Sequence, residues 1–169
     1  YVHHCLIPLV KDSLGDMQSS SNYRAIAISS LILKLLDWVI LLLEGNKLSV
    51  DQLQFGYQTN ISTSMCSWAV SSVIEHYNIR GTAIYGAALD CSKAFDMVDW
   101  WELFNDLKER QLSAVFLRLL IYIYVHQRCD VRWNNRFSTR FPVTNGCRQG
   151  VITSGIFFCI YSARLIKRL

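Results

Sequence analysis

The sequence predicts an α+β fold of mixed helices with a small sheet, and two kinds of apolar pattern support this. Two short apolar runs, residues 6–10 and 25–29, are typical of strands and are separated by a polar loop rich in Ser, Gly and Asp. Longer segments then carry apolar residues at helical spacing. Because strands and helices follow one another in mixed order, the pattern favours an α+β fold over a doubly wound parallel sheet.

The size and composition are those of one globular domain. The chain has 169 residues, of which 51% are hydrophobic, so it can bury a substantial core, and disorder is excluded. The six cysteines include no CxxC pair and no His partner at zinc-ligand spacing, so we expect no structural zinc. No signal peptide is visible, and scattered free thiols then fit a reducing compartment, the cytosol or the nucleus.

Helical periodicity places the helices, and a short polar turn places a hairpin. Ser62 or Thr63 is a suitable N-terminal cap for the second helix, and Gly81 follows its end. Residues 131–143 predict a β-hairpin that turns at Asn134 and Asn135. The predicted helices cover residues 31–43, 63–79, 100–110, 113–127 and 156–169.

The first of these helices is the longest apolar stretch, and it raises the question of a membrane. It is too short to span a bilayer and is interrupted by Lys34 and Asp37. These two charges and Glu44 fall on one helical stripe, whereas apolar residues occupy the rest of the surface. We therefore expect a buried helix with one solvent-exposed edge, and no membrane partner.

The uncharged apolar run at residues 83–89 ends on a carboxylate. Such a run predicts a strand that is covered on both faces, with Asp90 where the strand leaves the core. A carboxylate on a rigid strand end can hold Mg²⁺ for nucleotidyl transfer. On the residues alone, an equally good alternative is that Asp90 caps a following helix.

Basic residues are concentrated in the last quarter of the chain. Residues 131–169 contain seven Lys or Arg and no Asp or Glu. This predicts a phosphate-facing surface. For Arg164, Lys167 and Arg168 a solvated helix face is the better interpretation, whereas for Arg148 we favour a functional role.

Residues 87–96, Ala-Ala-Leu-Asp-Cys-Ser-Lys-Ala-Phe-Asp, resemble motif A of reverse transcriptases, and most closely those of non-LTR (LINE-type) retrotransposons. Further segments resemble other motifs of this family in the family's order, so the resemblance covers nearly the whole chain. They are the two fingers motifs at residues 6–12 and 22–29, the segment between fingers and palm at residues 54–58, and motif B at residues 145–150 with its continuation to residue 161.

The resemblance implies a right-hand polymerase architecture with fingers in residues 1–80 and a partial palm in residues 81–169. It implies RNA-directed DNA polymerase activity with two Mg²⁺ ions, held by Asp90 and by the backbone carbonyl of Cys91. The implied partners are an RNA template, a DNA primer, a dNTP and the remainder of the retroelement polyprotein. An intracellular location, nucleus or cytoplasm, is implied by the family alone.

The resemblance also implies which residues bind the nucleotide. Phe95 would lie beneath the sugar and exclude a 2′-hydroxyl, although a core aromatic is the alternative. Lys11 and Arg24 would clamp the triphosphate, with a surface cation as the alternative for either. The motif B residues that would line the pocket are Arg148, Gln149 and Gly150.

Three features of the site are less regular. Asp96 is expected to act at a helix start or behind the primary ligands rather than on a metal, and Asp99 is given no role. Motif B continues into Thr153-Ser154-Gly155 instead of a Leu-Ser-Pro-like turn, which predicts a looser helix start. No Asp or Glu follows Asp130, so the family's second metal-binding pair is missing, and we expect these residues alone to be inactive. A non-catalytic nucleic-acid-binding relic is the alternative.

Overall fold

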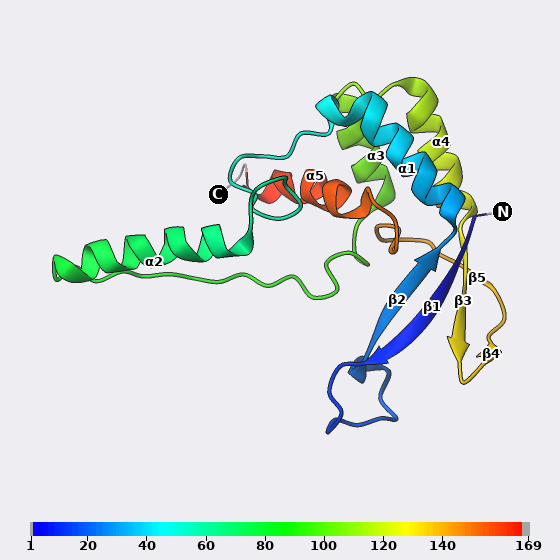
Figure 1. Ribbon diagram of the computed structural model, residues 1–169, viewed down its shortest axis with the longest axis horizontal. Coiled ribbons are helices and arrows are strands. Elements are labelled where there is room, and N and C mark those ends of the chain that lie inside the picture. The colour runs from blue at the N-terminus through cyan, green and yellow to red at the C-terminus, as the bar shows by residue number, and fades with distance from the viewer. Residues whose placement is uncertain (1, 167–169) are drawn as a thin grey trace.

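The computed structural model describes residues 2–166 and has an α+β fold, as the sequence predicts. Most of the helices gather at one end of the body and the sheet extends from it, whereas the helix of residues 63–79 projects to one side (Figure 1). The elements are β1 (His3–Val10), η1 (Ser20–Asn22), β2 (Tyr23–Ser29), α1 (Leu31–Glu44), η2 (Gly45–Lys47), α2 (Thr63–Ile79), α3 (Trp100–Glu109), α4 (Ala114–His126), β3 (Arg128–Trp133), β4 (Arg136–Phe137), β5 (Phe141–Pro142) and α5 (Ser154–Ile166).

The sheet joins the start of the chain to its last third. Its order is β2-β1-β3-β4, and β5 also pairs with β3. Strands β1 and β2 form an antiparallel hairpin, whereas β1 and β3 run parallel, with His4 opposite Cys129. The predicted β3–β4 hairpin is present, and both of its turn residues, Asn134 and Asn135, have positive φ, as a tight hairpin turn requires.

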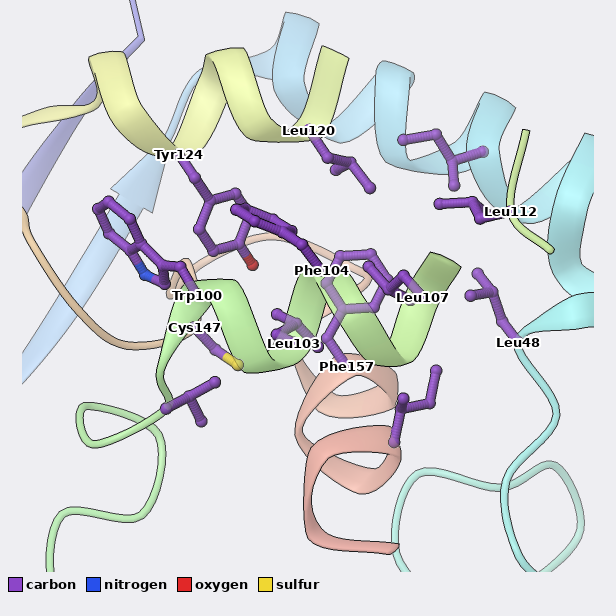
Figure 2. Close-up of a cluster of buried hydrophobic side chains, with 13 residues drawn as sticks. Leu48, Trp100, Leu103, Phe104, Leu107, Leu112, Leu120, Tyr124, Cys147 and Phe157 are labelled. Atoms are coloured by element: carbon purple, nitrogen blue, oxygen red, sulfur yellow. The ribbon is translucent and has the colours of Figure 1, made fainter. Parts of the chain in front are cut away.

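The hydrophobic core lies where α3, α4 and α5 meet, with contributions from α1 and from Leu48. Figure 2 shows the aromatic rings of Trp100, Phe104 and Tyr124 close together, with Phe157 reaching in from α5. Tyr124 meets the rings of both Trp100 and Phe104 edge to face. This packing holds in place two segments that contribute to the candidate site described below, residues 92–99 and 143–153.

Helices α3 and α4 begin at side-chain caps. The Asp99 carboxylate accepts a hydrogen bond from the backbone N–H of Glu102 (2.9 Å), and Ser113 caps α4 in the same way. The helix cap is therefore Asp99, whereas Asp96, for which the sequence predicted a helix start or a place behind the primary ligands, lies in the turn before it. The alternative of Asp90 as a helix cap is wrong, because α3 begins at Trp100 with Asp99 as its cap.

The predicted orientation of α1 is wrong, although its extent is close to the prediction. Asp37 and Glu44 are buried, whereas Leu31, Trp38 and Leu42 are exposed. Asp37 and Glu44 thus face the body, whereas Lys34 and most of the apolar surface face solvent. The physical reason is that Asp37 finds buried hydrogen-bond partners in the segment before α5. In residues 2–166, no helix has the length and apolar character needed to cross a bilayer.

The strand predicted at residues 83–89 is absent. These residues form an exposed coil after α2, which projects away from the rest of the body in Figure 1. A strand needs a neighbour for its backbone groups, and the sheet formed by the described residues offers none to this run. Helix α2 matches the prediction in extent, but it also has no buried residue.

Candidate functional site

A pocket of about 720 Å³ lies between the β1–β2 hairpin and two turns that are far apart in the sequence. Its size is within the range that small-molecule sites occupy. Five of the residues singled out from the sequence line it, namely Lys11, Arg24, Phe95, Arg148 and Gln149. Four separate segments of the chain thus supply the residues that the family resemblance implies for nucleotide binding.

The two turns, residues 92–98 and 145–150, are fastened to each other through their backbones. The N–H of Gly146 donates to the carbonyl of Val98 (2.9 Å), and the N–H of Cys147 donates to that of Phe95 (2.8 Å). The Trp100 indole adds a buried hydrogen bond to the carbonyl of Gly146 (2.8 Å). These contacts fix the relative position of the motif A and motif B matches.

Gln149 is held from both ends. Its side-chain Nε2 donates to Asp96 Oδ1 (2.8 Å), and its backbone carbonyl accepts from the Ser29 hydroxyl (3.0 Å). The Ser29 hydroxyl has only one proton and uses it in this bond. It therefore accepts a hydrogen bond from the Nδ1–H of His4, at 2.7 Å. Burial, aided by the positive charge of Arg148, lowers the pKa of His4 to about 4, so this imidazole is neutral near pH 7.

Arg148 is directed away from solvent. Its side chain is fully buried, and Nη2 donates to Asp37 Oδ1 at 2.8 Å. The guanidinium also lies over the ring of Tyr124, 5.3 Å from its centroid. Thr153 donates to the other Asp37 oxygen through its N–H (3.0 Å) and its hydroxyl (2.8 Å). Substrate contact by Arg148 stays a prediction, while the structure gives this side chain a partner in α1.

Phe95 sits in a small aromatic group at the side of the pocket. Its ring stacks on Phe158 with centroids 4.6 Å apart and meets Tyr57 edge to face at 6.1 Å. A Cβ at position 155 would collide with the Tyr57 ring, so only glycine leaves room for this ring against α5. The Thr153-Ser154-Gly155 turn is thus closely packed: Thr153 anchors it to Asp37, and Gly155 accommodates Tyr57.

Lys11 and Arg24 lie at the same end of the β1–β2 hairpin, beside its connecting loop: Lys11 directly follows β1, and Arg24 lies opposite Leu9. Both side chains are exposed at the pocket, and Lys11 Nζ donates to the carbonyl of Ser21 (2.8 Å). Lys93 also lines the pocket, although the sequence analysis did not single it out. Its place between Asp90 and Phe95 in the motif A match was the available signal.

Gly150 permits a close backbone approach to the sheet, and its role in nucleotide binding stays a prediction. Its φ is +76°, and an added Cβ would collide with the carbonyl of Ala27 in β2. The close backbone approach that this glycine permits is therefore to the sheet. Gly150 is not among the residues that line the pocket.

Asp90 and Cys91 are exposed in the coil that follows α2, and neither lines the pocket. Within residues 2–166, no three His, Cys, Asp or Glu side chains are grouped so that they could hold a metal ion. One carboxylate and one carbonyl do not fit a two-ion centre, which needs several carboxylates converging on one place. The metal role of these two residues stays a prediction.

Two comparisons with known proteins bear on the site. The family model described as reverse transcriptase (RNA-dependent DNA polymerase) matches residues 11–169, which include every one of the pocket residues singled out from the sequence. The chain is also 22% identical over 148 residues to the retrovirus-related Pol polyprotein from type-2 retrotransposable element R2DM of Drosophila melanogaster. That match covers 88% of this chain and 14% of the relative's length.

Proposed function

Because this chain belongs to the reverse transcriptase (RNA-dependent DNA polymerase) family, we propose that its pocket binds the incoming nucleotide of RNA-directed DNA synthesis. The predicted kinship with non-LTR retrotransposons is confirmed by the family match and by the similarity to a retrotransposon polyprotein. In this proposal residues 1–80 form the fingers and residues 81–169 the first part of the palm. The observation that carries it is the convergence of Lys11, Arg24, Phe95 and Gln149 on one pocket.

The chemistry of the pocket suits a nucleoside triphosphate. The exposed cations Lys11, Arg24 and Lys93 line it and would attract a polyphosphate. A guanidinium can contact two phosphate oxygens at once, whereas an ammonium acts as a point charge. The ring of Phe95, braced by Phe158, offers a rigid apolar surface against which a deoxyribose fits and a 2′-hydroxyl does not.

The template and primer are proposed to be RNA and DNA, held mainly through their backbones, because a polymerase has to accept any sequence. The exposed arginines of the β3–β4 hairpin, Arg132 and Arg136, would supply positive charge for these backbone contacts. The rest of the polyprotein would provide the remaining parts of the palm.

Divalent metal ions belong to the chemistry of this family, and Mg²⁺ is the ion we propose. When bound, the ions would activate the primer's 3′-hydroxyl and neutralise charge on the triphosphate. The described residues do not make up that centre. We propose that Asp90 and Cys91 contribute to it together with carboxylates from the rest of the polyprotein, and that residues 1–169 alone do not polymerise.

The full-length polyprotein provides the test. We expect it to extend a DNA primer on an RNA template with Mg²⁺, and Asp90→Ala to abolish this extension. Asp99→Ala is the matched control, because Asp99 caps α3 and should affect folding stability more than chemistry. Wild-type protein without extension would overturn the proposed function, and activity that survives Asp90→Ala would overturn the metal assignment.

The alternative of a non-catalytic relic gains no support from the irregular Thr153-Ser154-Gly155 turn. Thr153 and Gly155 are closely packed in this turn, so the departure from the usual motif has local structural compensation. The primer-extension assay separates the two functions, because a relic would bind nucleic acid without extending the primer.

A further inference from the structure

We propose that the β3–β4 hairpin carries a second binding site, in which Trp133 stacks on the base of an unpaired nucleotide and Arg136 contacts its phosphate. A cavity of about 600 Å³ lies there, and it shares no lining residue with the nucleotide pocket. Its lining residues are Val131, Trp133, Asn134, Arg136, Phe137 and Ser138. The inference rests on the proposed function in one respect, namely that the protein handles single-stranded nucleic acid.

Two large aromatic rings of this hairpin are open to solvent. Trp133 is 47% exposed and Phe137 is 62% exposed. The Phe137 ring already has the Arg132 guanidinium beside it, 6.0 Å from its centroid. The Trp133 ring is braced from within the sheet by Tyr23, which meets it edge to face with centroids 5.3 Å apart. Trp133 is therefore the ring that we assign to the base.

The hairpin offers these groups on a firmly held backbone. Trp133 lies opposite Arg136 in the register of β3 and β4. The N–H of Ser138 donates to the carbonyl of Val131 (2.9 Å), and the Ser138 hydroxyl accepts from the N–H of Val131 (2.9 Å). A ligand that binds here thus meets a ring and a cation whose backbones are already in place, so little ordering is needed on binding.

The charge around the hairpin favours an anionic ligand. Asp130 is the one acidic residue after Glu109 in the sequence. Its side chain is 8% exposed, bonds to His3 Nε2 at 2.8 Å and lies 3.9 Å from Arg140 Nε. Arg136 is exposed and carries its charge at the cavity. A phosphate backbone would therefore meet positive charge here, with the one nearby carboxylate already occupied.

A ring beside a guanidinium matches the two parts of a nucleotide, the base and the phosphate. Every base has a π-face, so stacking accepts any sequence. In a duplex the neighbouring bases cover these faces, and only an unpaired base can offer one to Trp133. Tyr23, which braces Trp133, also lines the nucleotide pocket, so a strand that leaves this pocket can reach the ring. Unpaired RNA and unpaired DNA share this chemistry.

Photochemical cross-linking to the full-length polyprotein locates the base. A short single-stranded oligonucleotide that contains 5-iodouracil would be irradiated with the protein, once as RNA and once as DNA. Trypsin cuts after Arg132 and Arg136, so the expected cross-linked peptide covers residues 133–136. Cross-linking of either oligonucleotide there supports the site and identifies the strand that it takes. A blunt duplex that cross-links there equally well, or competition by polyglutamate as strong as by unlabelled oligonucleotide, would overturn the inference.

Matched variants separate stacking from packing within the hairpin. Trp133→Leu keeps an apolar side chain but removes the ring, and it should raise the Kd for the oligonucleotide about tenfold, whereas Trp133→Phe should change it less than about threefold. Trp101→Leu is the control, because Trp101 is 63% exposed on α3, outside the hairpin. Arg136→Gln should lower the slope of log Kd against log salt by about 0.7, the value for one phosphate of a single strand.

The outcomes distinguish this inference from the proposed function. An unchanged Kd in Trp133→Leu, or an equal loss of affinity in Trp133→Phe, would overturn the stacking site, while primer extension by the wild-type polyprotein would still support the proposed function. Wild-type protein that cross-links at residues 133–136 but does not extend a primer would support the site and overturn the polymerase assignment. Wild-type protein that does neither would overturn both.

Discussion

The buried ion pair between α1 and the motif B segment gives the sharpest prediction about the fold. Asp37 is fully buried and accepts three hydrogen bonds, one from Arg148 and two from Thr153. Asp37→Ala would leave the buried Arg148 guanidinium without its counter-charge. Removing one partner of such a pair costs about 3–5 kcal/mol, and for a chain of this size that lowers Tm by roughly 10 °C.

Urea unfolding of the wild-type chain and of two α1 variants tests this reasoning. Trp38 follows Asp37 in sequence but is 62% exposed, so Trp38→Ala should cost less than about 1 kcal/mol. If α1 instead turned its apolar face to the core, as its sequence suggests, Trp38→Ala would cost about 3–5 kcal/mol and Asp37→Ala little. A larger effect at Trp38 than at Asp37, with unchanged m-values, would refute the orientation of α1.

Three further predictions concern other parts of the site. Gly155→Ala should displace Tyr57 and destabilise the chain by about 1–3 kcal/mol, which would be measured as a lower urea midpoint. Gly45→Ala is the control, because an added Cβ there meets no other atom. Burial lowers the pKa of His4 to about 4, so only the unfolded chain takes up this proton between about pH 6.5 and 4. Stability should therefore fall by about 2 kcal/mol as the pH falls through this range, and His4→Gln should reduce that slope. Phe95→Ala in the full-length polyprotein should raise ribonucleotide incorporation by at least about tenfold relative to deoxynucleotides; an unchanged ratio would leave Phe95 as a core aromatic.

The sequence predicted local structure well and long-range placement less well. The extents of α2, α3 and α4 followed from periodicity and caps such as Ser113, which depend on residues a few positions apart. The face that α1 buries depends on Arg148, 111 residues away, and no local pattern reveals that partner. The run at residues 83–89 has the composition of a strand, but a strand also requires a neighbour to pair with.

The same distinction applies to the candidate site. The resemblance to reverse transcriptases singled out Lys11, Arg24, Phe95 and Gln149, and the structure brings these four together. It did not reveal how they are held, because each support comes from elsewhere in the chain. The Asp96 carboxylate accepts a hydrogen bond from the Gln149 amide, and Gly155 makes room for the Tyr57 ring that packs on Phe95. Such supports become visible only when distant segments are placed side by side.

The affinity of the pocket for its nucleotide tests the central claim most directly. In primer extension by the full-length polyprotein, we predict that Arg24→Ala raises KM for dNTP about tenfold or more, because one phosphate contact is lost. Arg80→Ala, which removes an exposed arginine at the end of α2, should leave KM unchanged. Equal KM values for Arg24→Ala and Arg80→Ala would contradict the assignment of this pocket to the nucleotide.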